Sequence, residues 1–167
     1  MAKAVETRSP KGEQATEVIL ATFRVNGALL AAGDVLAAEF GLTSARWQVL
    51  GAIAQAQQPL TVPQIARRMG LTRQSVHTTV NRLLADGLVE LLENADHRRS
   101  QLVRLSELGE ASYRAVDAKQ AAWVNELAAG LTRAELETTA RVIRELASRL
   151  EPRSPANHTH EGDTHDR

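Results

Sequence analysis

Apolar residues recur every three or four positions through most of the chain, a spacing that gives an α-helix one buried face. The pattern predicts long helices over residues 13–40 and 106–129, and another over about 134–150. Between the first two it predicts three shorter helices, which Pro59 and Gly70 separate. Four helix starts share Leu-Thr with an apolar residue four positions after the Thr, as a threonine N-cap with a hydrophobic staple requires. These caps are Thr43, Thr61, Thr72 and Thr132.

The helix expected from Thr72 to Ala85 has two contrasting faces. Val76, Val80 and Leu83 recur at helical spacing and predict the buried side. The other side carries hydrogen-bonding side chains and no acid: Arg73, Gln74, Ser75, His77, Thr78, Asn81 and Arg82. Arg can bridge O6 and N7 of guanine, and Asn or Gln can bridge N6 and N7 of adenine. The face therefore favours contact with DNA bases over the alternative of a merely solvated surface, which usually mixes Glu with Lys.

The neighbouring segments extend this interpretation. Two short helices, 61–69 and 72–85, meet at a glycine-containing turn, as in a helix-turn-helix. Partial alternation then predicts strands at 88–93 and 101–105, joined by a polar loop. A helix-turn-helix followed by a β-hairpin is a winged helix. The predicted fold is thus mainly α, with a winged helix-turn-helix, a two-stranded β wing and long terminal helices.

Composition limits the alternatives. The 167 residues are 43% hydrophobic and 24% charged, which is typical of a soluble globular protein. The net charge is zero, but residues 60–105 hold seven basic and four acidic side chains, a local excess of +3. Such local clustering is the relevant quantity for phosphate contact. The absence of cysteine excludes disulfides and thiolate metal sites.

We expect a single domain over residues 13–151, in which residues 42–105 form the DNA-binding lobe. Residues 1–12 and 152–167 lack periodicity, and we expect them to be disordered. No apolar run approaches the ~20 residues of a membrane span and no signal peptide is visible, so we expect no membrane partner and a cytoplasmic location.

The predicted wing carries a motif that resembles the signature of a known family. Asp96-His97-Arg98, followed by Leu105-Ser106-Glu107-Leu108-Gly109, resembles the D-x-R…L-[ST]-x-x-G signature of the MarR family of winged-helix transcription regulators. Residues 42–50 and 86–89 also resemble that family. The order of elements matches from about residue 13 to residue 150, and the tails match nothing.

The resemblance implies a homodimer that binds palindromic double-stranded DNA, usually as a repressor. Residues 13–40 and 106–151 would dimerise, and the helix 72–85 would enter the major groove. The wing would deliver Arg98 and Arg99 to the minor groove, where a narrow electronegative channel attracts arginine. Asp96 would orient Arg98. The alternatives are two solvated arginines and a plain turn-forming aspartate.

The resemblance also implies a small aromatic effector, bound between the dimerisation helices and the DNA-binding lobe. Arg46 could pair with a ligand carboxylate and Trp47 could stack on its ring. The alternative for Trp47 is a staple and core position. A redox-sensing branch of the family uses an N-terminal cysteine, which this chain lacks.

Catalysis is not indicated. No Gly-rich phosphate loop, nucleophile elbow or carboxylate pair is present, and we expect no cofactor. His158, His160 and His165 have metal-ligand spacing but no framework around them, so we expect no metal site. His77 on the polar face could contact a base or phosphate, or simply be exposed. The alternative function is a winged helix for protein–protein contact without sequence-specific DNA binding, which the acid-free face disfavours.

Overall fold

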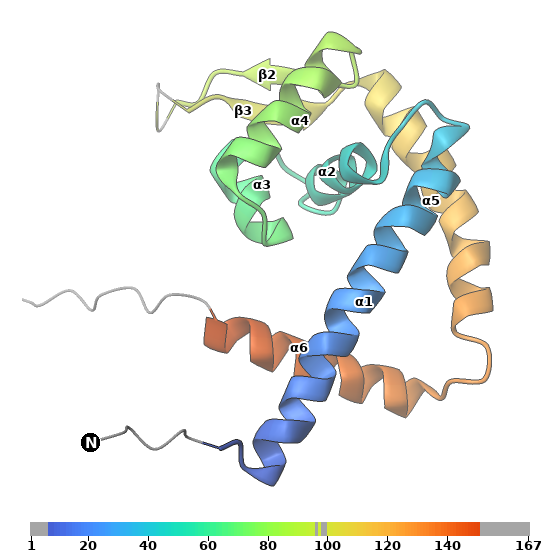
Figure 1. Ribbon diagram of the computed structural model, residues 1–167. Coiled ribbons are helices and arrows are strands. Elements are labelled where there is room, and N and C mark those ends of the chain that lie inside the picture. The colour runs from blue at the N-terminus through green and yellow to red at the C-terminus, as the bar shows by residue number, and fades with distance from the viewer. Residues whose placement is uncertain (1–6, 96, 98–99, 151–167) are drawn as a thin grey trace, which may run out of the picture. The chain divides into compact units, whose positions relative to one another are not determined.

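The computed structural model describes residues 7–95, 97 and 100–150 (Figure 1). Their elements follow the predicted order of helices, helix-turn-helix, wing and helices, which confirms the winged-helix fold. The bounds are α1 Pro10–Ala38, α2 Ser44–Ala54, β1 Leu60–Thr61, α3 Val62–Met69, α4 Arg73–Ala85, β2 Val89–Leu92, β3 Leu102–Leu105, α5 Glu107–Leu127 and α6 Arg133–Leu150. The chain divides into two compact units, with the boundary after Val124 in α5.

In the first unit, α2, α3 and α4 pack together beside the β-sheet (Figure 1). Each of these helices contributes to one core of aliphatic residues. Its largest fully buried side chains are Leu50, Leu60, Ile65, Leu83, Val49, Val76, Val103 and Val116. The helix-turn-helix therefore stands on a continuous core that includes strand residues and one residue of α5.

The helix-turn-helix has the predicted caps. At the start of α3, the Thr61 hydroxyl accepts from the Gln64 backbone N–H at 3.4 Å, and the Gln64 side chain accepts from the Thr61 N–H at 2.7 Å. Gly70 ends α3 with φ +63°, a left-handed conformation that strains other residues. The predicted Thr61 N-cap and the helix end at Gly70 are both confirmed.

The sheet has a strand that the sequence did not reveal. β3 lies between β2 and a two-residue β1, both antiparallel to it. Leu60 pairs with Val103, and Thr61 pairs with Leu102. Two residues are too few to show alternation, and Leu60 also fits a hydrophobic staple, so the sequence interpretation stopped at a two-stranded wing.

α1 begins three residues before the expected start, because Ser9 caps it and Pro10 occupies its first turn. Only Gly33, Leu36 and Ala37 of its 29 residues are buried. An 18-residue window has a mean hydropathy of 1.4, so length and composition alone would allow a membrane span, contrary to the sequence expectation. Signal sequences and core helices pass the same test, which makes this weak grounds for a membrane helix.

The second unit contains α6 with its own capping box. The Thr132 backbone N–H and hydroxyl both donate to the Glu135 carboxylate, at 2.8 and 2.7 Å. Both hydrogen bonds lower the pKa of the Glu135 carboxyl below its usual value of 4.5. The bond from the Thr132 hydroxyl has the larger effect, and the bond from the Thr132 backbone N–H has the smaller one. None of the 18 residues of α6 is buried.

Candidate nucleic-acid interface

The helix α4 buries three apolar residues on one side and exposes polar residues on the other. Val76, Val80 and Leu83 are at most 2% exposed and form part of the core. The seven side chains of α4 that were predicted to contact DNA are all exposed, and we call them the recognition face: Arg73, Gln74, Ser75, His77, Thr78, Asn81 and Arg82. The structure therefore brings these predicted residues together on one accessible surface.

Within the recognition face, some polar groups are already engaged. Thr72 caps α4 by accepting from the Ser75 N–H at 3.1 Å. The Thr78 hydroxyl donates to the Gln74 carbonyl at 3.1 Å, and Asn81 Nδ2 lies 3.3 Å from His77 Nδ1. With His77 in the tautomer that accepts this bond, the Asn81 carbonyl oxygen is left for an external donor.

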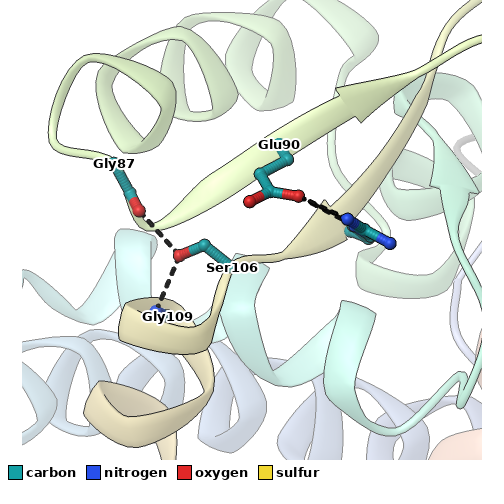
Figure 2. Close-up of polar contacts among 5 residues, drawn as sticks. Gly87, Glu90, Ser106 and Gly109 are labelled. Carbon is teal, nitrogen blue, oxygen red and sulfur yellow. Dashed lines mark hydrogen bonds and ion pairs between the residues drawn. The ribbon is translucent and has the colours of Figure 1, made fainter.

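The C-terminal end of α4 is tied to the start of α5. Gly87, with φ +70°, follows the helix, and its carbonyl accepts from Ser106 Oγ at 2.6 Å. The same Ser106 oxygen accepts from the Gly109 N–H at 3.0 Å (Figure 2). A Cβ at Gly109 would lie 1.9 Å from the Leu88 carbonyl oxygen, which no side chain tolerates. The serine and glycine of the Leu105–Gly109 motif are therefore junction residues between α4, the wing and α5.

At the base of the wing, side-chain contacts supplement the antiparallel backbone pairing of β2 and β3. Arg104 on β3 donates Nε and Nη2 to one Glu90 carboxylate oxygen on β2, at 2.9 and 2.7 Å. Towards the tip, Asn94 Nδ2 donates to the Ser100 carbonyl at 2.9 Å. The predicted wing residues Asp96, Arg98 and Arg99 lie outside the described residues.

The structure separates the two residues predicted to hold a ligand. Neighbouring side chains on a helix diverge by about 100°, because one turn takes 3.6 residues. Trp47 packs partly against the core and lines a cavity. Arg46 does not line that cavity; its guanidinium instead pairs with Asp86 and donates to the Gly41 carbonyl. Arg46 thus has a structural partner that spacing along the sequence did not indicate.

That cavity lies in the first unit and has a volume of about 530 Å³. It is lined from α1, α2, α3 and α5, by Asn26, Leu29, Leu30, Trp47, Gln48, Gly51, Ala52, Gln55, Arg68, Met69, Tyr113, Gln120 and Trp123. Arg68 is the single charged residue of this lining, and the remaining polar side chains are amides and one phenol. The volume lies within the range of small-molecule sites.

Sequence reasoning missed most of this lining, including Arg68, Tyr113 and Trp123. Tyr113 and Trp123 lie in the helix predicted over residues 106–129, where helical spacing alone gave no sign of a ligand site. The low aromatic content was a usable signal, because the chain has two tryptophans and one tyrosine, and all three line this cavity. For metal sites, no group of three or more His, Asp or Glu side chains gathers within the described ranges. His158, His160 and His165 lie outside them.

A family model and several solved structures name the same family. A family model described as the MarR family matches residues 40–100. A protein of Mycobacterium tuberculosis is 36% identical over 143 residues, 86% of this chain and 99% of its own length. The transcriptional activatory protein BadR of Rhodopseudomonas palustris is 32% identical over 71 residues, 41% of each chain.

Solved structures of MarR family regulators share the fold. Another structure with this fold is CouR from Rhodococcus jostii RHA1, crystallised with p-coumaroyl-CoA bound. It is 22% identical, has a TM-score of 0.68, and the match covers 74% of this chain and 87% of that one.

Proposed function

Because the chain belongs to the MarR family of DNA-binding transcription regulators, which are not enzymes, we propose that it is a cytoplasmic homodimeric repressor of a palindromic operator. A small aromatic ligand releases it from the DNA. The recognition face of α4 enters the major groove, and the wing residues Arg98 and Arg99, with Asp96 orienting Arg98, contact the minor groove.

One observation carries the DNA-binding part of this proposal. Seven hydrogen-bonding side chains on α4 are exposed and include no acid, while Val76, Val80 and Leu83 are buried in the core. The buried face holds the helix, and the exposed face offers Arg, Gln and Asn groups that match guanine and adenine edges. A surface that binds another protein usually includes a large apolar or aromatic side chain that becomes buried in the complex, and the recognition face has none.

The test is selection of a binding sequence from random DNA with the full chain, followed by affinity measurement. Gln74→Ala should lower affinity for the selected operator by ~1–3 kcal/mol and leave random DNA nearly unaffected. Gln14→Ala is the matched control, because Gln14 is an exposed glutamine on α1. Failure to select any sequence would contradict the proposal and favour the protein-interaction alternative.

Dimerisation is supported separately within each unit. On α1, Val18, Ile19, Phe23 and Leu29 are between 37% and 69% exposed. On α6, Leu136, Ile143 and Leu150 are between 42% and 83% exposed. Apolar surfaces of this extent mark interaction sites, and a two-fold dimer is the commonest way to cover them. A partner protomer also accounts for the apolar composition of α1 without a membrane.

The sign of regulation needs its own experiment, because the relative BadR is an activator. A reporter gene behind the selected operator, with and without the protein, should show lower transcription when the protein is present. Higher transcription would replace repression with activation and leave the DNA-binding proposal intact.

The effector part is supported by the cavity. Trp47, Tyr113 and Trp123 supply aromatic surfaces. Arg68 supplies a guanidinium group that can donate two parallel hydrogen bonds to one carboxylate. Arg68 replaces Arg46 as the candidate ligand cation. CouR, which shares the fold, was crystallised with a ligand that contains an aromatic acyl group.

Titration of aromatic carboxylates into the operator complex tests the effector. Binding should weaken by the ~1–3 kcal/mol typical of coupled sites, and Arg68→Gln should abolish that response. Arg67→Gln is the matched control, because Arg67 is the adjacent exposed arginine and does not line the cavity. An unchanged operator affinity across a broad panel would remove the aromatic effector from the proposal.

A further inference from the structure

One arginine side chain joins three segments of the first unit. Arg46 lies in the first turn of α2, and its Nη1 donates to the Gly41 carbonyl at 3.1 Å, in the turn after α1. Its Nη2 pairs with the carboxylate of Asp86, the residue that ends α4. Only 18% of the Arg46 side chain is exposed, and its Nε is buried without a hydrogen-bond partner in the described part of the chain. Because so enclosed a cation would be uncompensated without its carboxylate, the pair is held in place.

The C-terminal end of α4 is consequently fixed from two sides. Arg46 holds it through Asp86, and Ser106 holds it through the Gly87 carbonyl (Figure 2). A cation at this position also stabilises the negative end of the helix dipole. At the other end, among the described residues, Thr72 is the one side chain outside α4 that hydrogen-bonds its first turn. The recognition face therefore projects from an anchored C-terminal end.

We propose that Arg46 is a positioning residue that sets the spacing between half-sites which the regulator accepts. This inference rests on the proposed binding of a palindromic operator by a dimer. Two-fold related recognition helices must meet half-sites about one helical turn apart, ~10 bp. The exposed apolar face of α1 leads into the turn at Gly41, and Arg46 connects that turn to α4. A rotation of α4 about this bridge would change the separation of the two recognition helices.

The geometry explains why an arginine is needed. Its planar fork donates to two acceptors in fixed directions, whereas a lysine ammonium is a single point charge on a flexible stem. Arg46→Lys should therefore keep an ion pair with Asp86 and lose the simultaneous bond to the Gly41 carbonyl. We expect that variant to keep its affinity for an isolated half-site while its preference for one spacing weakens.

The experiment uses the full chain and an operator selected from random DNA. Affinities are measured for that operator, for versions with one base pair inserted or removed between half-sites, and for a single half-site. Arg46→Gln should reduce the ratio between correct and altered spacing on the order of tenfold, as expected for a coupled pair. Asp86→Asn should do the same, and the double variant should lose no more than either alone. Affinity for the single half-site should change little.

The matched control is Lys119→Gln. Lys119 pairs with Glu39 at 2.5 Å, just after the end of α1, in an ion pair that includes no residue of α4. Its removal should leave the spacing ratio unchanged, which separates positioning from a general loss of rigidity. If Arg46→Gln does not fold, Arg46→Lys and Asp86→Asn provide the same ratio. An unchanged ratio in the folded variants would overturn this inference alone, whereas failure to select an operator would overturn the proposed function with it.

Discussion

The helices α4 and α6 start in the same way but differ in what covers them. Each follows a Leu-Thr pair, and in each the threonine hydroxyl accepts from a backbone N–H three residues later, at 3.1 Å in α4 and 3.3 Å in α6. Three residues of α4 are buried, whereas none is in α6. Local sequence thus determines where a helix starts and which of its faces is apolar. Whether that face is buried depends on the other elements that pack against it.

This difference suggests separate roles for the two apolar faces, one within the protomer and the other between protomers. The face of α4 stabilises the protomer, because its residues already contact the core. The face of α6 has no such cover within its unit, so we propose that it stabilises the dimer. Substitutions in α4 should then affect folding, and substitutions in α6 should affect association.

The largest expected effect concerns the packed face. Leu83→Ala should lower the free energy of unfolding by about 2–5 kcal/mol, because the buried side chain leaves a cavity. Chemical denaturation measures this. Leu150→Ala is the matched change on α6, where the side chain is 83% exposed in the protomer, so its cost should appear in dimer dissociation and not in the unfolding of the protomer. Equal losses would show that the two faces are covered alike.

The second prediction concerns association. Ile143→Asp should raise the dimer dissociation constant more than about a hundredfold, because an unpaired charge in an apolar interface costs several kcal/mol. Analytical ultracentrifugation over a concentration series measures it, and helix content should be retained. Arg141→Asp also introduces an acid but lies on the other side of α6, so it should remain dimeric. A dimer that survives Ile143→Asp would exclude this face from the interface.

A smaller effect distinguishes the outer faces. Arg82 on α4 and Arg141 on α6 are both exposed arginines. Arg82→Ala should reduce the salt dependence of DNA binding by about one unit per half-site, because a phosphate contact is lost. Arg141→Ala should leave it unchanged. Operator affinity across a salt series tests the pair, and equal slopes would move the DNA contact away from α4.

The smallest effect is a pH dependence that only α6 should show. Hydrogen bonds from Thr132 lower the pKa of Glu135, so its contribution to helix stability is present above the ordinary value of 4.5. It is lost as the pH falls through the lowered pKa. The residue at the same position of α4 is Ser75, which does not titrate there. Hydrogen exchange should show earlier acid fraying at the start of α6, and Glu135→Gln should abolish the difference between the helices.

Sequence reasoning succeeded where a local pattern determines structure. Helical periodicity located Val76, Val80 and Leu83 as buried residues, and threonine capping located Thr61 and Thr132 as helix starts. Each of these depends on neighbours within a few positions along the chain. For the same reason the acid-free face of α4 could be recognised before its exposure was known.

It failed where distant segments meet. Leu60 pairs with Val103, 43 positions away, and Arg46 reaches Asp86, 40 positions away. Arg68 shares a cavity with Trp123, although nothing in the spacing of these two residues suggests it. Such contacts follow from tertiary packing, which helical and strand periods do not encode.

The aromatic lining of the cavity also gives the protein a built-in optical probe. Trp47, Trp123 and Tyr113 are all the tryptophan and tyrosine that the chain contains. Its near-ultraviolet absorption and fluorescence therefore originate almost entirely in that cavity, while the recognition face of α4 carries no chromophore of this kind. Ligand binding should quench the tryptophan emission directly. DNA binding should leave the emission unchanged unless it changes the surroundings of the tryptophans. A stopped-flow trace recorded without any label would then separate the time at which the cavity fills from the time at which DNA departs.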